Sequence, residues 1–186
     1  MIKYIITDFD GTLVDTKEAN VLAYKDAFKQ CGYTFNNNLY SSAFGLNFSD
    51  MCDKLNIDKN INIRNKIKKL KQKIYPKYFN NVSLNKSLFE FIKYMKHYNN
   101  IKTAIASTAS KENLYNLLDF FKIKQYWDVI ITNNDVSNGK PDPEVYNITK
   151  KCLCVENNDE VLVFEDSYYG ILAAQTAGIN NIIKVL

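Results

Sequence analysis

The chain has 186 residues, enough to bury the core of one domain or of one domain with a modest insertion. Its formal net charge is +4, and Arg64 is its only arginine, so almost all of the positive charge comes from lysine. The composition therefore excludes recognition by clusters of arginine forks, and no apolar stretch approaches the eighteen or so residues that span a bilayer.

Cysteine and histidine do not form a metal or thiol site in this sequence. Cys31 and Cys52 are far apart, Cys152 and Cys154 lack the spacing of a zinc knuckle, and His97 is the only histidine. We expect reduced thiols in a cytoplasmic protein without a signal peptide or membrane segment. Acid–base chemistry would then fall to carboxylates.

The N-terminal segment, residues 2–8, has the apolar character of a buried strand and ends in two carboxylates. Asp8 and Asp10 are two positions apart, so their side chains could point the same way, and Gly11 and Thr12 then turn the chain with backbone N–H groups available to an anion. This arrangement suggests metal-assisted phosphoryl chemistry. Taken alone, a strand that runs into an Asp-rich turn explains the same residues equally well.

Residues 17–80 show only helical periodicity. The pattern predicts a first helix that ends at Gly32, two short helices at 36–44 and 47–55, and a last helix before Pro76. We therefore expect a four-helix domain, inserted at 17–80 after the first strand.

From about residue 84, predicted helices alternate with short apolar strands. The helices cover 86–97, 111–121, 144–152 and 169–177, and the strands cover 101–106, 129–132, 161–164 and 181–185. This alternation is typical of an α/β protein, a Rossmann-like parallel sheet with about five strands, formed by residues 1–16 and 81–186. Ligands of such sheets bind outside the carboxyl ends of the strands.

Polar groups follow three more of these strands. Ser107 and Thr108 come before a helix, as an anion site would require, although Ser110 could also be a plain helix cap. Lys140 lies between a glycine and a proline in a turn. Glu165 and Asp166 supply hard oxygen ligands of the kind that Mg²⁺ prefers.

Together these motifs resemble the haloacid dehalogenase superfamily, and a helical insertion after the first motif resembles its subgroup of phosphatases and β-phosphoglucomutases. The resemblance covers essentially the whole chain. The matching blocks are Asp8-Phe9-Asp10-Gly11-Thr12, Ile105-Ala106-Ser107-Thr108, Gly139-Lys140-Pro141-Asp142-Pro143 and Phe164-Glu165-Asp166-Ser167, with Gly170, Ala173-Ala174 and Ala177-Gly178 downstream.

The resemblance implies a role for each matching residue. Asp8 would be the nucleophile that becomes an aspartyl phosphate, and Asp10 would be the general acid and base. Ser107, the Thr108 amide and Lys140 would hold the phosphoryl oxygens. Mg²⁺ would be bound by Asp8, the backbone carbonyl of Asp10 and Asp166, with Glu165 at a second position.

Two departures from the family pattern favour a phosphatase over a mutase. Phosphoglucomutases of the subgroup carry a histidine in the first cap linker and an arginine in the cap loop, whereas here Asn20 and the segment 45–48 offer neither. We therefore expect a Mg²⁺-dependent phosphatase of a small phosphorylated metabolite. The alternatives are a sugar-phosphate mutase and a catalytically silent phospho-ligand binding protein.

The expected partners follow from the same features. The lysine-rich stretch Lys59–Lys77 has apolar residues at helical spacing, so a solvated helix face is the simplest interpretation. We expect a monomer that binds neither nucleic acid nor membrane. The last predicted strand ends near Leu186, whereas many members of the family continue through a further strand and helix; a minimal member and an incomplete sequence are both compatible with this.

Overall fold

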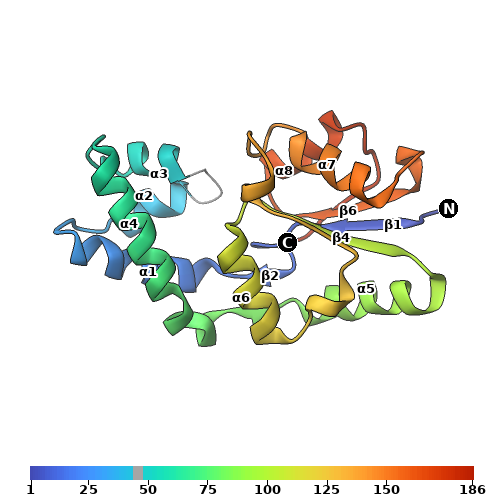
Figure 1. Ribbon diagram of the computed structural model, residues 1–186, viewed down its shortest axis with the longest axis horizontal. Coiled ribbons are helices and arrows are strands. Elements are labelled where there is room, and N and C mark those ends of the chain that lie inside the picture. Colours follow the sequence, from blue (N-terminus) through green and yellow to red (C-terminus); the bar gives the residue numbers. More distant parts are fainter. Residues whose placement is uncertain (44–47) are drawn as a thin grey trace. The chain divides into compact units, whose positions relative to one another are not determined.

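The computed structural model describes residues 1–43 and 48–186, which form two compact units (Figure 1). Met1–Asp15 and Ser83–Leu186 form one, called the α/β unit below, and Thr16–Val82 forms the other, called the helical unit. Within the described residues, no helix is both long and apolar enough to cross a membrane.

The α/β unit is built on a five-stranded sheet in which every neighbouring pair of strands is parallel. The order is β5-β4-β1-β6-β7, which places the N-terminal strand at the centre. The strands are β1 (Tyr4–Thr7), β4 (Lys102–Ala106), β5 (Val129–Ile131), β6 (Val161–Glu165) and β7 (Ile182–Lys184). This confirms the predicted α/β fold.

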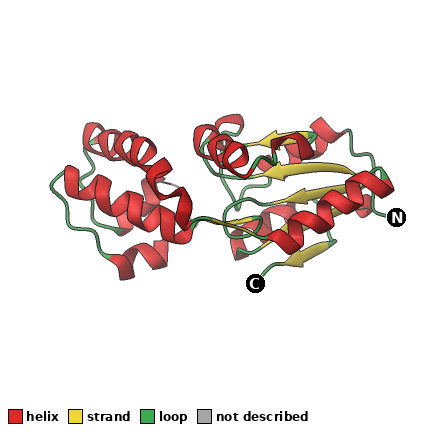
Figure 2. Cartoon of the chain, turned by 90° about the horizontal axis from the view of Figure 1, so that it is seen from below, coloured by secondary structure: helices red, strands yellow, loops and turns green. Residues whose placement is uncertain are grey.

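Helices cover both faces of this sheet, which is why its inner strands are mostly apolar rather than alternating. Figure 1 shows α7 and α8 on one face and α5 and α6 on the other, and Figure 2 shows helices overlying the strands of this unit. Their bounds are α5 (Lys86–Asn99), α6 (Lys111–Phe121), α7 (Glu144–Leu153) and α8 (Tyr168–Thr176). Strands and helices of this unit agree with the predicted ranges to within two residues.

Side-chain caps mark where α5, α6 and α8 begin. The side chain of Asn85 accepts a hydrogen bond from Leu88 N at 3.2 Å, and Ser110 and Ser167 cap α6 and α8 in the same way. Each side chain satisfies an N–H group that has no partner within its helix. The sequence had indicated Ser110 as a cap, and the structure confirms it.

A short antiparallel ribbon lies where the chain leaves and re-enters the α/β unit. It pairs β2 (Val14–Asp15) with β3 (Ser83–Leu84). The sequence analysis missed this ribbon, because each strand has two residues and its partner is far away in the chain.

The helical unit contains α1 (Lys17–Gln30), α2 (Asn37–Ala43), α3 (Phe48–Lys54) and α4 (Ile61–Ile74), followed by the 3₁₀ helix η1 (Tyr75–Asn81). Helix α1 buries alanines and a phenylalanine and packs against α4. The four predicted α-helices are thus present among the described residues, whereas η1 was not predicted.

Arg64 has a structural role in the helical unit. Its side chain is buried and donates to Asp53 Oδ1 at 2.7 Å, to Ile57 O at 3.0 Å and to Asp58 O at 2.9 Å. The guanidinium thereby holds the loop before α4 against α3. The single arginine of the chain is therefore not exposed to bind a ligand.

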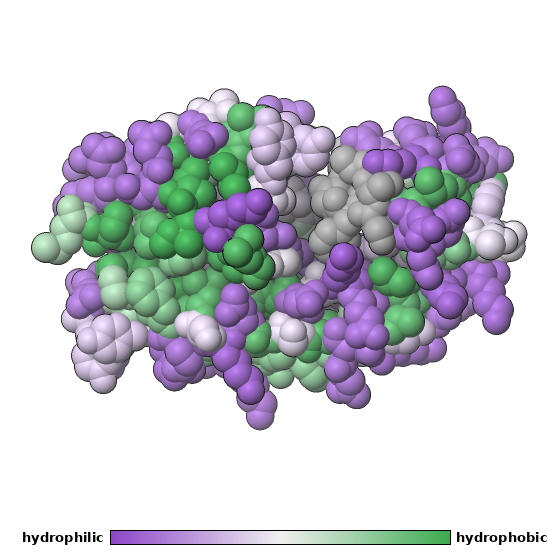
Figure 3. Space-filling model, turned by 180° about the vertical axis from the view of Figure 1, so that it is seen from behind, coloured by the Kyte–Doolittle hydropathy of each residue, from purple (hydrophilic) through white to green (hydrophobic). Residues whose placement is uncertain are grey.

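The sheet is least covered at its β7 edge. Phe91 on α5 and Ile183 on β7 are both partly exposed. The Phe91 ring packs against Phe164, which is the register partner of Ile183, so these three residues lie on one face of the sheet. Figure 3 shows apolar side chains gathering on the visible face of this unit.

Candidate active site

Three adjacent strands bring polar residues to one edge of the sheet. Asp8 follows β1, Ser107 follows β4 and Glu165 ends β6, and the sheet order places β1 between the other two. The backbone continues the ladder here: Asp8 N donates to Phe164 O at 2.9 Å, and Ser107 N donates to Ile131 O at 3.0 Å. These hydrogen bonds hold the polar residues at defined positions.

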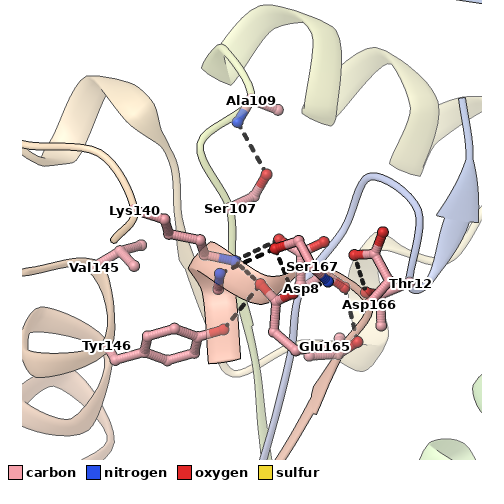
Figure 4. A network of polar contacts seen from close by, with 12 residues as sticks. Asp8, Thr12, Ser107, Ala109, Lys140, Val145, Tyr146, Glu165, Asp166 and Ser167 are labelled. Atoms are coloured by element: carbon pink, nitrogen blue, oxygen red, sulfur yellow. Dashed lines mark hydrogen bonds and ion pairs between the residues drawn. The ribbon is translucent and has the colours of Figure 1, made fainter. Parts of the chain in front are cut away.

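Lys140 joins the carboxylates of two of these strands (Figure 4). Its Nζ lies 2.6 Å from Asp8 Oδ1 and also forms an ion pair with Glu165. The side chains are almost completely buried, with exposed fractions of 7% for Lys140, 9% for Asp8 and 1% for Glu165. The site is thus a buried triad of one lysine and two carboxyl groups.

Glu165 accepts four hydrogen bonds from protein groups. Lys140 and the Tyr146 hydroxyl donate to Oε1, the latter at 3.3 Å, whereas Ser167 donates to Oε2 from its N at 2.9 Å and from its Oγ at 3.0 Å. A carboxylate has about four acceptor positions, so all of them have donors here. Glu165 is therefore fixed in place and can orient Lys140.

Two glycines allow the carboxylates to come this close to the backbone. A Cβ at Gly170 would lie 1.7 Å from Glu165 Oε1, and a Cβ at Gly11 would lie 2.3 Å from Asp166 Oδ2. Gly11 also has a φ of +95°, which favours glycine. A side chain at either position would push a carboxylate out of the site.

Asp166 is held beside this triad. Its Oδ1 accepts a hydrogen bond from Thr12 Oγ1 at 3.0 Å, which links β6 to the turn after β1. Burial raises the pKa of Asp166 above its usual value, and the Thr12 hydroxyl opposes that shift. Its carboxylate would be easier to ionise beside a cation.

Burial and neighbouring charges shift the pKa values of Asp8 and Lys140 in opposite directions. Burial raises the pKa of Asp8 to about 8, although Lys140 partly offsets the shift. Burial also tends to lower the pKa of Lys140, but Asp8, Tyr146 and Glu165 outweigh it, so the pKa lies well above its usual value. Lys140 therefore stays cationic, and a further positive charge would favour the ionised form of Asp8.

The acidic residues of the site fit a small divalent cation. One carboxylate oxygen from each of Asp8, Glu165 and Asp166 can be chosen so that all lie within 4.8 Å of one another. Mg²⁺ prefers such hard oxygen ligands and retains several waters. Because the Glu165 oxygens already have four donors, Asp8 and Asp166 are the better candidates for direct ligands.

The remaining predicted site residues lie near this cluster. Asp10 is partly exposed and bridges to Val14, and its charge contributes to the raised pKa of Asp8. Ser107 is buried, and its Oγ accepts from Ala109 N at 3.0 Å. Thr108 is exposed, and its methyl group would be 3.6 Å from a Cβ at Gly139, which places it beside the turn that carries Lys140.

Sequence reasoning missed Tyr146, Thr12 and Ser167 as parts of this network. Tyr146 occupies the first turn of α7 and had no motif of its own to distinguish it from core tyrosines. Of the features that bear on the mutase alternative, Asn20 is partly buried on α1, and residues 44–47 lie outside the described part of the chain.

Comparison with known proteins indicates one family. The model of the haloacid dehalogenase-like hydrolases matches residues 5–184. A phosphorylated carbohydrates phosphatase from Thermotoga maritima is 28% identical over 187 residues, covering 98% of this chain and 84% of that protein. A pyrophosphatase from Oceanobacillus iheyensis is 24% identical and covers 96% of this chain and 81% of its own length.

Solved structures show the same fold. A candidate β-phosphoglucomutase from Thermotoga maritima is 27% identical with a TM-score of 0.75, covering 100% of this chain and 86% of that one. CbbY from Rhodobacter sphaeroides, solved in complex with phosphate, is 24% identical with a TM-score of 0.87, and the match covers 100% and 88% of the two chains.

Proposed function

This chain belongs to the haloacid dehalogenase-like hydrolases and is an enzyme, and we propose that it is a Mg²⁺-dependent phosphatase of a small phosphorylated metabolite. A phosphorylated carbohydrate is the substrate class that the Thermotoga relative supports. The observation that carries the proposal is the buried Asp8 carboxylate, hydrogen-bonded at 2.6 Å to Lys140 and grouped with Asp166. A nucleophile needs to be held in this way beside cationic charge when it attacks an anionic phosphorus centre.

The first chemical step uses Asp8 and Asp10. A carboxylate oxygen of Asp8 attacks phosphorus while the bond from phosphorus to the ester oxygen breaks, and Asp10 gives its proton to the leaving oxygen. Lys140 and the Ser107–Thr108 turn hold the phosphoryl oxygens, where charge shifts during the transfer. The product is an aspartyl phosphate on Asp8 and a free alcohol.

The second step reverses the role of Asp10. It takes a proton from water as the water oxygen attacks phosphorus, the bond to Asp8 breaks, and inorganic phosphate leaves with Asp8 regenerated. Mg²⁺, held by Asp8, Asp166 and the Asp10 carbonyl with Glu165 at a second position, would neutralise charge on the phosphoryl oxygens when bound. Glu165 orients Lys140 throughout.

The helical insertion at 17–80 has a different part in this proposal. The α/β residues 1–16 and 81–186 perform the chemistry, and the insertion selects among phosphate esters. A chimera that carries the insertion of a relative with another substrate should therefore change its substrate preference and still depend on Asp8.

Phosphate release tests the main proposal. Purified protein is assayed on phosphosugars, phosphoglycolate and nucleotides with and without Mg²⁺, alongside Asp8→Asn and the control Asp119→Asn, an exposed residue of α6. We expect Mg²⁺-dependent release from at least one ester, lost in Asp8→Asn and kept in Asp119→Asn. No hydrolysis of any ester, or full activity in Asp8→Asn, would reject the proposal.

A sugar-phosphate mutase is the second candidate, because the Thermotoga structure of that description is similar to this chain. The enzyme is incubated with β-glucose 1-phosphate and a small amount of glucose 1,6-bisphosphate. Free phosphate as the main product supports the phosphatase, whereas glucose 6-phosphate as the main product supports the mutase. A silent binding protein would form neither.

A further inference from the structure

Helix α4 has two chemically distinct faces. Its inward face buries Arg64, Ile67, Lys71 and Ile74 within the helical unit. The opposite side, at about 100° per residue, consists of exposed asparagine and lysine side chains. We call this surface the lysine face, and its members are Asn62, Asn65, Lys66, Lys69 and Lys73.

The lysine face is not neutralised by nearby acids. Residues 59–77 contain no aspartate or glutamate, and the helical unit, 16–82, has twelve basic and five acidic residues, a net charge of +7. In the part of the chain that the structure describes, none of the ion pairs found involves Lys66, Lys69 or Lys73. The face is therefore a concentrated positive charge exposed to solvent.

The spacing on this face suits a linear ligand. Lys66, Lys69 and Lys73 follow one another along the helix axis at about 4.5 and 6 Å, from the rise of an α-helix. An open, shallow surface hollow of about 460 Å³ over α4 is lined by Asn62, Asn65, Lys66, Lys69, Leu70 and Lys73. An extended anion lying along this face could meet all three ammonium groups in turn.

The side chains of the lysine face indicate which class of anion it could bind. It has no aromatic side chain on which a base could stack, and no arginine for bidentate contacts. Its apolar side is already packed inside the helical unit, so α4 has no face left to insert into a membrane. Lysine binds phosphate as a point charge, and the asparagine amides add neutral donors to phosphate oxygens.

We propose that the lysine face binds a linear chain of phosphates, and specifically inorganic polyphosphate. This ligand has the highest charge per length among phosphate chains and needs no base contacts. The surface lies outside the residues assigned to catalysis, so the proposal does not depend on the phosphatase activity.

Fluorescence anisotropy with end-labelled inorganic polyphosphate tests this proposal. All proteins carry Asp8→Asn, so that turnover does not destroy the probe. The test variant is Lys66→Gln, Lys69→Gln, Lys73→Gln, and the matched control is Lys86→Gln, Lys151→Gln, Lys184→Gln, which removes the same charge from exposed positions of the α/β unit. Circular dichroism verifies that both remain folded, since glutamine is a good helix former.

At 0.1 M salt, we expect the test variant to bind polyphosphate at least about tenfold more weakly than the Asp8→Asn protein. The affinity of the control variant should stay within about twofold of that protein. The slope of log affinity against log salt should also fall by about 2 in the test variant, because each neutralised charge contributes about 0.7 for a single-stranded chain. Equal losses in both variants would overturn the proposal. Equally tight competition by an oligodeoxythymidine of the same charge would also overturn it, in favour of nucleic acid.

Discussion

Lys140 Nζ lies 2.6 Å from Asp8 Oδ1, although 132 residues separate them in the chain. One comes from the end of the central strand and the other from the turn before α7. The contact places a buried cation against a buried carboxylate, and Glu165 shares the same ammonium group. This one contact therefore bears on both the stability and the proposed chemistry of the α/β unit.

Removing this cation should destabilise the protein. Lys140→Met leaves Asp8 and Glu165 buried without a counter-charge, which should lower the free energy of unfolding by about 3–5 kcal/mol. Urea denaturation in EDTA at pH 9, above the raised pKa of Asp8, measures this, with the exposed Lys151→Met as a control. Adding Asp8→Asn to Lys140→Met should recover part of the loss, and a loss no larger than that of the control would contradict the prediction.

Asp10 should matter most when the leaving group is poor. Asp10→Asn should lower kcat for a sugar phosphate by about 10²- to 10⁴-fold, the usual contribution of general acid–base catalysis. An aryl phosphate needs little protonation of its leaving oxygen, so formation of the aspartyl phosphate should slow less. Rapid-quench measurement of both substrates tests this, and equal slowing of that step for both would argue against Asp10 as the acid.

Metal dependence follows from the cluster of Asp8, Glu165 and Asp166. EDTA should abolish phosphatase activity and Mg²⁺ should restore it. Ca²⁺ should inhibit, since its larger and looser coordination sphere misplaces the reacting groups. Steady-state assays with each ion test this prediction. Full activity in EDTA would show that the reaction does not need a metal ion.

The Tyr146 hydroxyl should contribute to catalysis through Glu165. Tyr146→Phe removes one of the four donors to Glu165 and keeps the ring beside Lys140. We expect kcat to fall by about three- to tenfold, with KM within about twofold, which corresponds to the loss of one ordinary hydrogen bond. Tyr4→Phe is the control, because its hydroxyl donates at the same 3.3 Å to Cys154 O, a backbone group of the turn after α7. Identical kinetics for the two variants would contradict the prediction.

The raised pKa of Asp8 predicts how stability changes with pH when no metal is added. Burial moves this pKa from 3.8 to about 8. Between these values the folded protein binds a proton that the unfolded chain has released, so the free energy of unfolding contributed by Asp8 falls as pH rises. Asp8→Asn removes this dependence. Thermal unfolding in EDTA should show that the stability of Asp8→Asn increases relative to that of the wild type between pH 5 and pH 8. A difference in stability that does not change with pH would refute the assignment.

Local patterns were sufficient to predict most of the fold. The apolar strand before Asp8, the alternation after residue 84 and the cap at Ser110 depend on neighbouring residues, and the observed elements agree with them. The clustering of Asp8, Glu165 and Asp166 follows from the same topology, because parallel strands have their carboxyl ends at one edge of a sheet. A sequence that predicts a parallel sheet therefore also predicts that the polar residues at its strand ends gather at one edge.

Only the tertiary structure decided the finer relationships. The ribbon of β2 and β3 pairs two-residue strands that are distant in the chain, and the burial of Arg64 depends on carbonyl groups of a loop. The four donors to Glu165 come from Lys140, Tyr146 and Ser167, and whether they meet depends on side-chain rotamers and on the space that Gly170 leaves open. Periodicity and motif spacing do not predict such contacts, because the contacts are set by the packing of elements that are remote in sequence.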